Sequence, residues 1–128
     1  MFDPRQFQLN EAWIVFRLNE VPIVTEVDGD FNVLALMDAA SGFMLGTEFI
    51  PASSMEPSQL ESKRLLKNGQ SHQHLLPKQL VLPTELVAEI LSSEAERNGI
   101  VIVRLPEKQL RAVTSEAIEG FNRHIGGG

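Results

Sequence analysis

The sequence has no cysteine and no long hydrophobic run, and both absences limit what the protein can be. Without cysteine, structural disulfides and thiol chemistry are excluded, although this says little about the compartment. No apolar run approaches the roughly 18 residues that are needed to cross a bilayer. The first residues, MFDPRQFQLNEAW, lack the basic start and apolar stretch of a secretory signal, so we expect a cytoplasmic protein.

Positive charge is also scarce. The chain has 11 Lys and Arg against 17 Asp and Glu, which gives a net charge of −6. Because nucleic-acid binding depends largely on neutralising phosphates, we expect no general nucleic-acid binding. The nearest approach to a basic patch is Lys63, Arg64 and Lys67, which is typical of a solvated helix face. With 128 residues, 43% of them hydrophobic, the chain suits one domain over residues 1–125 and a flexible tail over 126–128.

The first half of the chain is rich in strand signals. Apolar runs predict a strand over residues 12–18, a weaker edge strand over 21–27, and a strand covered on both faces over 31–37. Asp38 to Gly42 is typical of a tight turn, since Asp38 can accept backbone N–H groups and Gly42 can adopt positive φ. The chain then returns over residues 43–50. Alternation predicts one shared face for Phe43, Leu45, Thr47 and Phe49.

The second half alternates helices and strands. We expect a short helix over residues 58–67 that ends at Asn68-Gly69, followed by a surface loop over 69–76. A buried strand over 79–82 leads to a helix from Thr84 to about Arg97 with an apolar stripe, and then to a buried parallel strand over 100–105. A last helix follows Pro106. The fold class is therefore α/β, with a mixed sheet covered by helices. The residues expected on the inner face of the last helix are Leu110, Val113, Ala117, Phe121 and Ile125.

Four local motifs occur in a recognisable order. Trp13 opens the first strand, LALMDAASGFMLG forms a hairpin, Pro77-x-x-Leu80 precedes a buried strand and helix, and residues 118–123 read IEGFNR. Together they resemble the ribonuclease H-like fold, in its transposase and retroviral-integrase branch, over roughly residues 12–125. The chain is also similar to a group of uncharacterised bacterial domains with this layout.

The resemblance implies a degenerate catalytic site. The family uses three carboxylates that converge on divalent metal ions, and these positions fall at Phe16, Pro83 and Glu119. Phenylalanine and proline side chains cannot ligate Mg²⁺, so only Glu119 keeps an acid. We therefore expect no catalytic residues, no cofactor and no resident metal. The favoured interpretation is an integrase-like module that binds another protein, with homo-oligomerisation left open.

The alternative interpretation is a metal-dependent nuclease whose carboxylates have moved. Asp38, Glu119 and one of Asp28 or Asp30 would then form the metal site. Turn chemistry explains Asp38, Asp28 and Asp30 more simply, and Glu119 also suits an exposed helix face. His72-x-His74 provides two potential zinc ligands, whereas a zinc site needs three or four.

Overall fold

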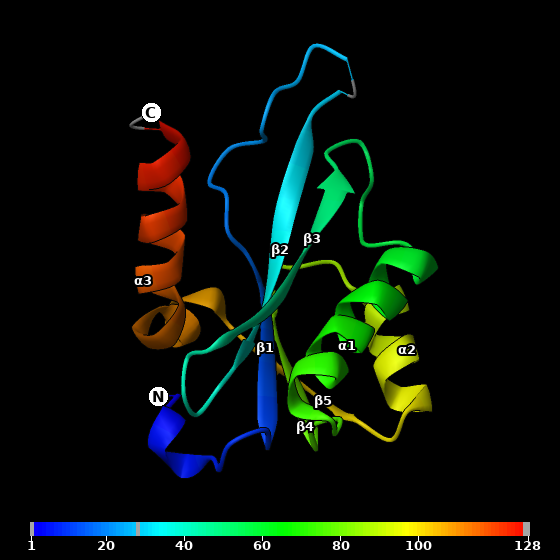
Figure 1. Ribbon diagram of the computed structural model, residues 1–128, viewed down its shortest axis with the longest axis vertical. Coiled ribbons are helices and arrows are strands. Elements are labelled where there is room, and N and C mark those ends of the chain that lie inside the picture. Colours follow the sequence, from blue (N-terminus) through cyan, green and yellow to red (C-terminus); the bar gives the residue numbers. More distant parts are fainter. Residues whose placement is uncertain (1, 28, 127–128) are drawn as a thin grey trace.

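A computed structural model describes residues 2–27 and 29–126, and it forms a sheet between two helical layers (Figure 1). The sheet has five strands in the order β3-β2-β1-β4-β5. Pairing is antiparallel between β1 and β2 and between β2 and β3, and parallel between β1 and β4 and between β4 and β5. The elements are a 3-10 turn (Pro4–Gln6), β1 (Ala12–Arg17), β2 (Phe31–Asp38), β3 (Met44–Pro51), α1 (Gln59–Gln73), β4 (Gln79–Pro83), α2 (Glu89–Arg97), β5 (Val101–Leu105) and α3 (Glu107–Gly126).

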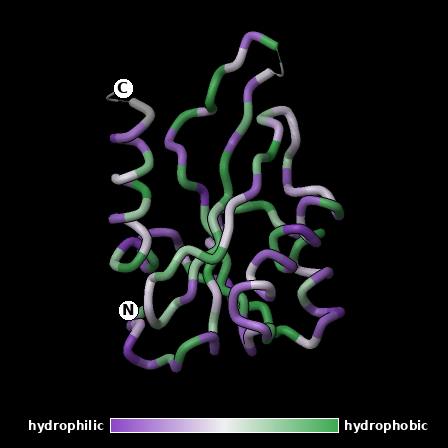
Figure 2. The backbone as a smooth tube through the Cα atoms, in the orientation of Figure 1, coloured by the Kyte–Doolittle hydropathy of each residue, from purple (hydrophilic) through white to green (hydrophobic). Residues whose placement is uncertain are grey.

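The two faces of the sheet carry separate hydrophobic clusters. Trp13, Leu36 and Leu80 belong to the cluster under α1 and α2, whereas Ile14 and Phe16 belong to the one under α3. Since alternate residues of a strand point to opposite faces, β1 and β2 must be apolar throughout. Figure 2 shows hydrophobic residues concentrated along the central strands. The predicted strands over 12–18, 31–37 and 79–82 and the predicted last helix are confirmed.

The predicted end of the first helix at Gly69 is wrong. The helix α1 continues to Gln73, and His74 caps it in the left-handed conformation. Gly69 is buried inside the helix, where a Cβ would lie 2.6 Å from Cη2 of Trp13. The glycine therefore allows α1 to approach the indole of β1 closely. It does not end the helix.

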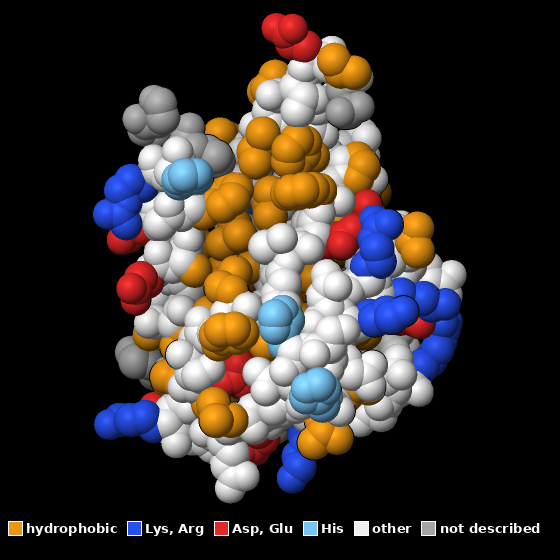
Figure 3. Space-filling model, in the orientation of Figure 1, with side chains coloured by type: hydrophobic (Ala, Val, Ile, Leu, Met, Phe, Trp, Pro, Cys, Tyr) orange, Lys and Arg blue, Asp and Glu red, His pale blue; other side chains and the backbone are white. Residues whose placement is uncertain are grey.

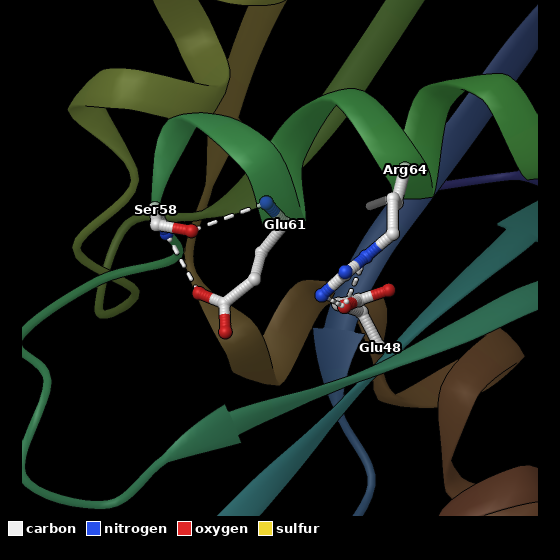
Figure 4. Close-up of polar contacts among 4 residues, drawn as sticks. All are labelled: Glu48, Ser58, Glu61 and Arg64. Carbon is white, nitrogen blue, oxygen red and sulfur yellow. Dashed lines mark hydrogen bonds and ion pairs between the residues drawn. The ribbon is translucent and has the colours of Figure 1, made fainter.

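The start of α1 follows local sequence chemistry. The hydroxyl of Ser58 accepts the backbone N–H of Glu61, and the Glu61 carboxylate accepts the backbone N–H of Ser58 (Figure 4). This reciprocal pair satisfies two donors that the first turn of a helix otherwise leaves free. Ser58 is thus the N-cap, and Pro57 precedes the helix instead of lying in its first turn.

The second predicted helix begins later than expected. It starts at Glu89, so residues 84–88 form a turn and an irregular segment and not a first helical turn capped by Thr84. Arg104 Nη1 donates to the carbonyls of Pro83 and Leu86, which engages two backbone acceptors just before the helix. The buried residues of α2 are Leu91, Glu94 and Ala95.

Three further predictions about strands are corrected. The segment 21–27 forms only one isolated bridge, between Ile23 and Phe31. A β-bulge between β2 and β3 shifts Leu45 to the α1 side, so it does not share a face with Thr47 and Phe49. The strand β5 is parallel to β4, as predicted, but it is only half-buried because it lies at the edge of the sheet.

Residues 127–128 of the predicted tail lie outside the described residues, and α3 includes Gly126. Among residues 2–27 and 29–126, no helix combines the length and apolar character that a bilayer-spanning segment requires.

Candidate functional site

Phe16 and Pro83 line the same cavity. It measures about 380 Å³ and lies at the carboxyl ends of the parallel strands β1 and β4, on the face covered by α3. Leu110, Thr114 and Ile118 of α3 form its other wall. In open α/β sheets, ligands commonly bind in the crevice outside the carboxyl ends of the strands. The cavity therefore stands where this fold is expected to place a functional site.

The rim of the cavity is charged although its floor is apolar. Glu20, Glu85 and Glu107 follow β1, β4 and β5, and the rim also includes Arg17. The Arg17 guanidinium donates to the carbonyls of Asn19 and Glu20. These three glutamates were not predicted as site residues, because they are distant in sequence and only the strand order brings them together.

Glu85 supports the start of α3. Its carboxylate accepts the backbone N–H of Glu107 at 2.9 Å, and this hydrogen bond is the main reason that the pKa of Glu85 is lowered. A carboxylate at the N-terminus of a helix is also favoured by the helix dipole. The hydrogen bond means that Glu85 has a structural role at the rim of the cavity.

The structure separates the predicted acids. Glu119 is exposed on α3 and does not line the cavity, so the three positions implied by the resemblance do not all converge. Asp38 pairs with Trp13 at the start of β1, whereas the cavity lies at the other end of that strand. Asp28 lies outside the described residues, and Asp30 is exposed.

Asp38 has the turn-forming role that the sequence predicted. Its carboxylate accepts the backbone N–H of Asn10 at 2.8 Å, the backbone N–H of Ser41 at 2.9 Å and the Ser41 hydroxyl at 2.7 Å. Gly42 has φ +75°, as expected for this turn. With three donors around it, the buried carboxylate of Asp38 holds the turn to the segment before β1.

No site with three or more clustered His, Asp or Glu ligands occurs among residues 2–27 and 29–126. His72 lies edge-on to Phe43, with ring centroids 5.9 Å apart, and His74 is the C-cap of α1.

A strip of apolar side chains lies between α3 and the β2–β3 hairpin (Figure 3). Phe31 and Phe49 pack against one another at 5.2 Å between ring centroids, and Phe49 is 61% exposed. We define the apolar strip as Ile23, Phe31 and Phe49, with the half-buried Ile118 and Phe121 of α3 beside it. Exposed apolar patches of this kind commonly mark interaction surfaces.

Comparison with known proteins shows the fold. No protein-family model and no curated protein sequence matches the chain. Among solved structures, the catalytic core domain of BIV integrase matches with a TM-score of 0.54 and 15% identity. The match covers 86% of this chain, which spans 65% of the length of the integrase chain. The protein thus has a ribonuclease H-like, integrase-core fold, as the sequence predicted, and the likeness to bacterial domains stays a prediction.

Proposed function

We propose that the protein is a non-catalytic domain with an integrase-like fold that acts by binding another protein. The proposal that the domain is non-catalytic rests on one observation, which is that Phe16 and Pro83 line the same cavity. The resemblance places two metal-ligating acids at these positions, and the structure brings the two side chains to one cavity. Because neither side chain can ligate Mg²⁺, the site that would hold the metal in an integrase core is apolar at its floor.

The proposal predicts that divalent cations do not stabilise the protein. We expect the same thermal midpoint with and without Mg²⁺ or Mn²⁺, because only a ligand that binds the native state raises the midpoint. The measurement is thermal unfolding across a cation titration, together with cleavage of single- and double-stranded DNA, for the wild type and Glu119→Ala.

The same cation titration also tests a second function, a metal-dependent nuclease. In this alternative the carboxylates are relocated, and Glu20 and Glu107 at the rim of the cavity would have to move closer together, because no three carboxylates form a metal-binding group among residues 2–27 and 29–126. It predicts a Mn²⁺-dependent rise in the midpoint and cleavage that both disappear when Glu20 and Glu107 are changed to Gln. That result would overturn the non-catalytic proposal. A rise that is lost only in Glu119→Ala would instead support a metal site that includes Glu119.

The apolar strip supports the proposal that the protein binds another protein. A protein with a net charge of −6 is poorly suited to nucleic acid, whereas exposed aromatic side chains are enriched where proteins bind one another. Phe49 is the strongest anchor on the strip because most of its ring is accessible and Phe31 supports it from the side.

Loss of the aromatic anchor should weaken binding of the protein partner. We expect Phe49→Ser to bind its protein partner at least about tenfold more weakly, since truncating an aromatic anchor typically costs about 2 kcal/mol or more. The measurement is quantitative capture from a lysate of the source organism, followed by mass spectrometry. Leu60→Ser is the matched control, because Leu60 is 61% exposed on α1, outside the strip. Equal recovery of the same proteins by all variants would contradict the assignment.

A further inference from the structure

The floor of the cavity beneath α3 suits a hydrocarbon chain. Phe16 and Leu110 are only 3% and 1% exposed, Pro83 is buried beside them, and Ile118 adds a further apolar side chain. The volume of about 380 Å³ lies within the range of pockets that hold a ligand, roughly 300–1,000 Å³. The inner part of an occupant should therefore be apolar.

The polar groups that the cavity offers to an occupant are acceptors. Glu20 and Glu107 line it with carboxylates, which only accept hydrogen bonds when they are ionised. The hydroxyl of Thr114, in the buried wall, donates its proton to the carbonyl of Leu110 at 3.1 Å, so its oxygen is left to accept. An occupant should therefore bring donors.

The donors at the rim already have partners within the chain. The side-chain N–H groups of Asn19 go to the carbonyl of Val21 and to Oδ1 of Asn32, at 2.8 and 2.9 Å. The guanidinium of Arg17 donates to the carbonyls of Asn19 and Glu20 and forms no ion pair with a rim carboxylate in the described part of the chain. These contacts leave the acceptors of the cavity for an external donor.

The carboxylates of Glu20 and Glu107 have no ion-pair partner among residues 2–27 and 29–126. Glu85 differs from them, because it accepts the backbone N–H of Glu107 and the hydroxyl of Thr84, and Arg111 supplies a nearby positive charge. Glu85 also occupies the N-terminus of α3, where an external anion would otherwise be favoured. The cavity is thus better suited to a cation than to an anion.

We propose that the cavity binds an arginine side chain of the partner protein, an inference that rests on the proposed function. Arginine combines an apolar stem with a flat guanidinium that carries five donors and no acceptor. The stem packs on Phe16 and Leu110, and the guanidinium pairs with Glu20 and Glu107. Lysine has the same charge, but its ammonium is more strongly hydrated and acts as a point charge, so two carboxylates favour arginine.

The cavity is continuous with the apolar strip. Ile118 lines the cavity and also lies beside the strip, so both contact surfaces follow one side of α3. A protein that covers Phe49 can therefore place an arginine in the cavity within the same interface. The aromatic anchor then supplies apolar burial, and the paired guanidinium supplies specificity.

The test uses N-acetyl-L-arginine amide, which presents the side chain without charged termini. Titrated into isotope-labelled protein and followed by NMR, it should give saturable shifts at the backbone amides of Glu20, Thr114 and Ile118, with a Kd on the order of 1 mM. The citrulline analogue, in which a neutral urea replaces the guanidinium, should bind at least about tenfold more weakly. The lysine analogue should bind at least about threefold more weakly.

Matched variants locate the binding. Glu20→Gln and Glu107→Gln each remove one charge and keep the size of the side chain, so each should raise the Kd at least about threefold. Glu119→Gln is the control, because it makes the same change on an exposed residue of α3 outside the cavity and should leave the Kd unchanged. The double variant of Glu20 and Glu107 should also lower recovery of the protein whose capture depends on Phe49.

Equal binding of the arginine and citrulline analogues, or an affinity that neither Glu20→Gln nor Glu107→Gln changes, would overturn the inference. Tighter binding of the lysine analogue would overturn the choice of arginine. Capture by Phe49→Ser is measured separately. If Phe49→Ser loses the partner while the arginine amide does not bind, the proposed function stands and this inference fails. If the amide binds while Phe49→Ser captures as much as the wild type, the strip is removed from the proposed function and the cavity is not.

Discussion

Gly69→Val should be the most destabilising single substitution on α1. A Cβ at residue 69 would lie 2.6 Å from Cη2 of Trp13 and 2.7 Å from Cδ2 of Leu36. Both neighbours are fully buried core side chains, so neither can move aside into solvent. Overpacking of a tight core typically costs about 1–3 kcal/mol, and we expect Gly69→Ala in this range and Gly69→Val above it. The measurement is urea unfolding, compared with the wild type.

Gly120→Ala is the matched control for this prediction. Gly120 also lies inside a helix, but a Cβ there would meet nothing within 4 Å. Alanine should stabilise α3 by about 0.5–1 kcal/mol, because glycine loses more conformational freedom in a helix. Opposite signs at the two positions would show that the contact with Trp13 decides the effect. Stabilisation by alanine at both positions would mean that α1 does not lie so close to the indole.

Gly69 illustrates how much of the fold could be predicted from the sequence. The strands of the sheet centre were predictable because a strand covered on both faces is apolar at nearly every position. The length of α1 was not, since Asn68-Gly69 matches the local signal for a helix end. Only the distance to Trp13, which lies more than 50 residues earlier in the chain, explains the glycine. Local sequence patterns therefore predicted which helices and strands exist better than they predicted where each one ends.

The candidate site was predictable only in part. The resemblance placed two of the family's three acid positions at Phe16 and Pro83 and left open whether these residues are neighbours, and in the structure both line one cavity. It also suggested Glu119, which is exposed outside that cavity. The rim acids Glu20 and Glu107 carry no local motif, and their approach depends on the order of the strands in the sheet. A site assembled from strand ends far apart in the sequence cannot be read from spacing along the chain.

Asp38→Ala should show that the most buried acid among the described residues is structural. The carboxylate is 0% exposed and accepts hydrogen bonds from Asn10 and from the backbone and side chain of Ser41. Asn10 in turn accepts the indole N–H of Trp13 at 2.6 Å, so Asp38 also positions the residue that holds the core tryptophan. Alanine leaves these donors without a partner, and we expect a loss of about 2–4 kcal/mol in the free energy of unfolding.

Asp30→Ala is the control. Asp30 is an exposed acid directly before β2, and its loss should change the free energy of unfolding by less than about 0.5 kcal/mol. Asp38→Asn keeps one acceptor oxygen and should fall between the two. Unfolding in urea measures all three variants, and a Mn²⁺ titration of Asp38→Ala separates the structural role from a metal-binding one. If Asp38 only holds the turn and Asn10, the variant loses stability equally with and without Mn²⁺. If the loss appears only in the presence of Mn²⁺, Asp38 binds the ion, and the relocated metal site that the sequence left open becomes the better explanation of the carboxylate.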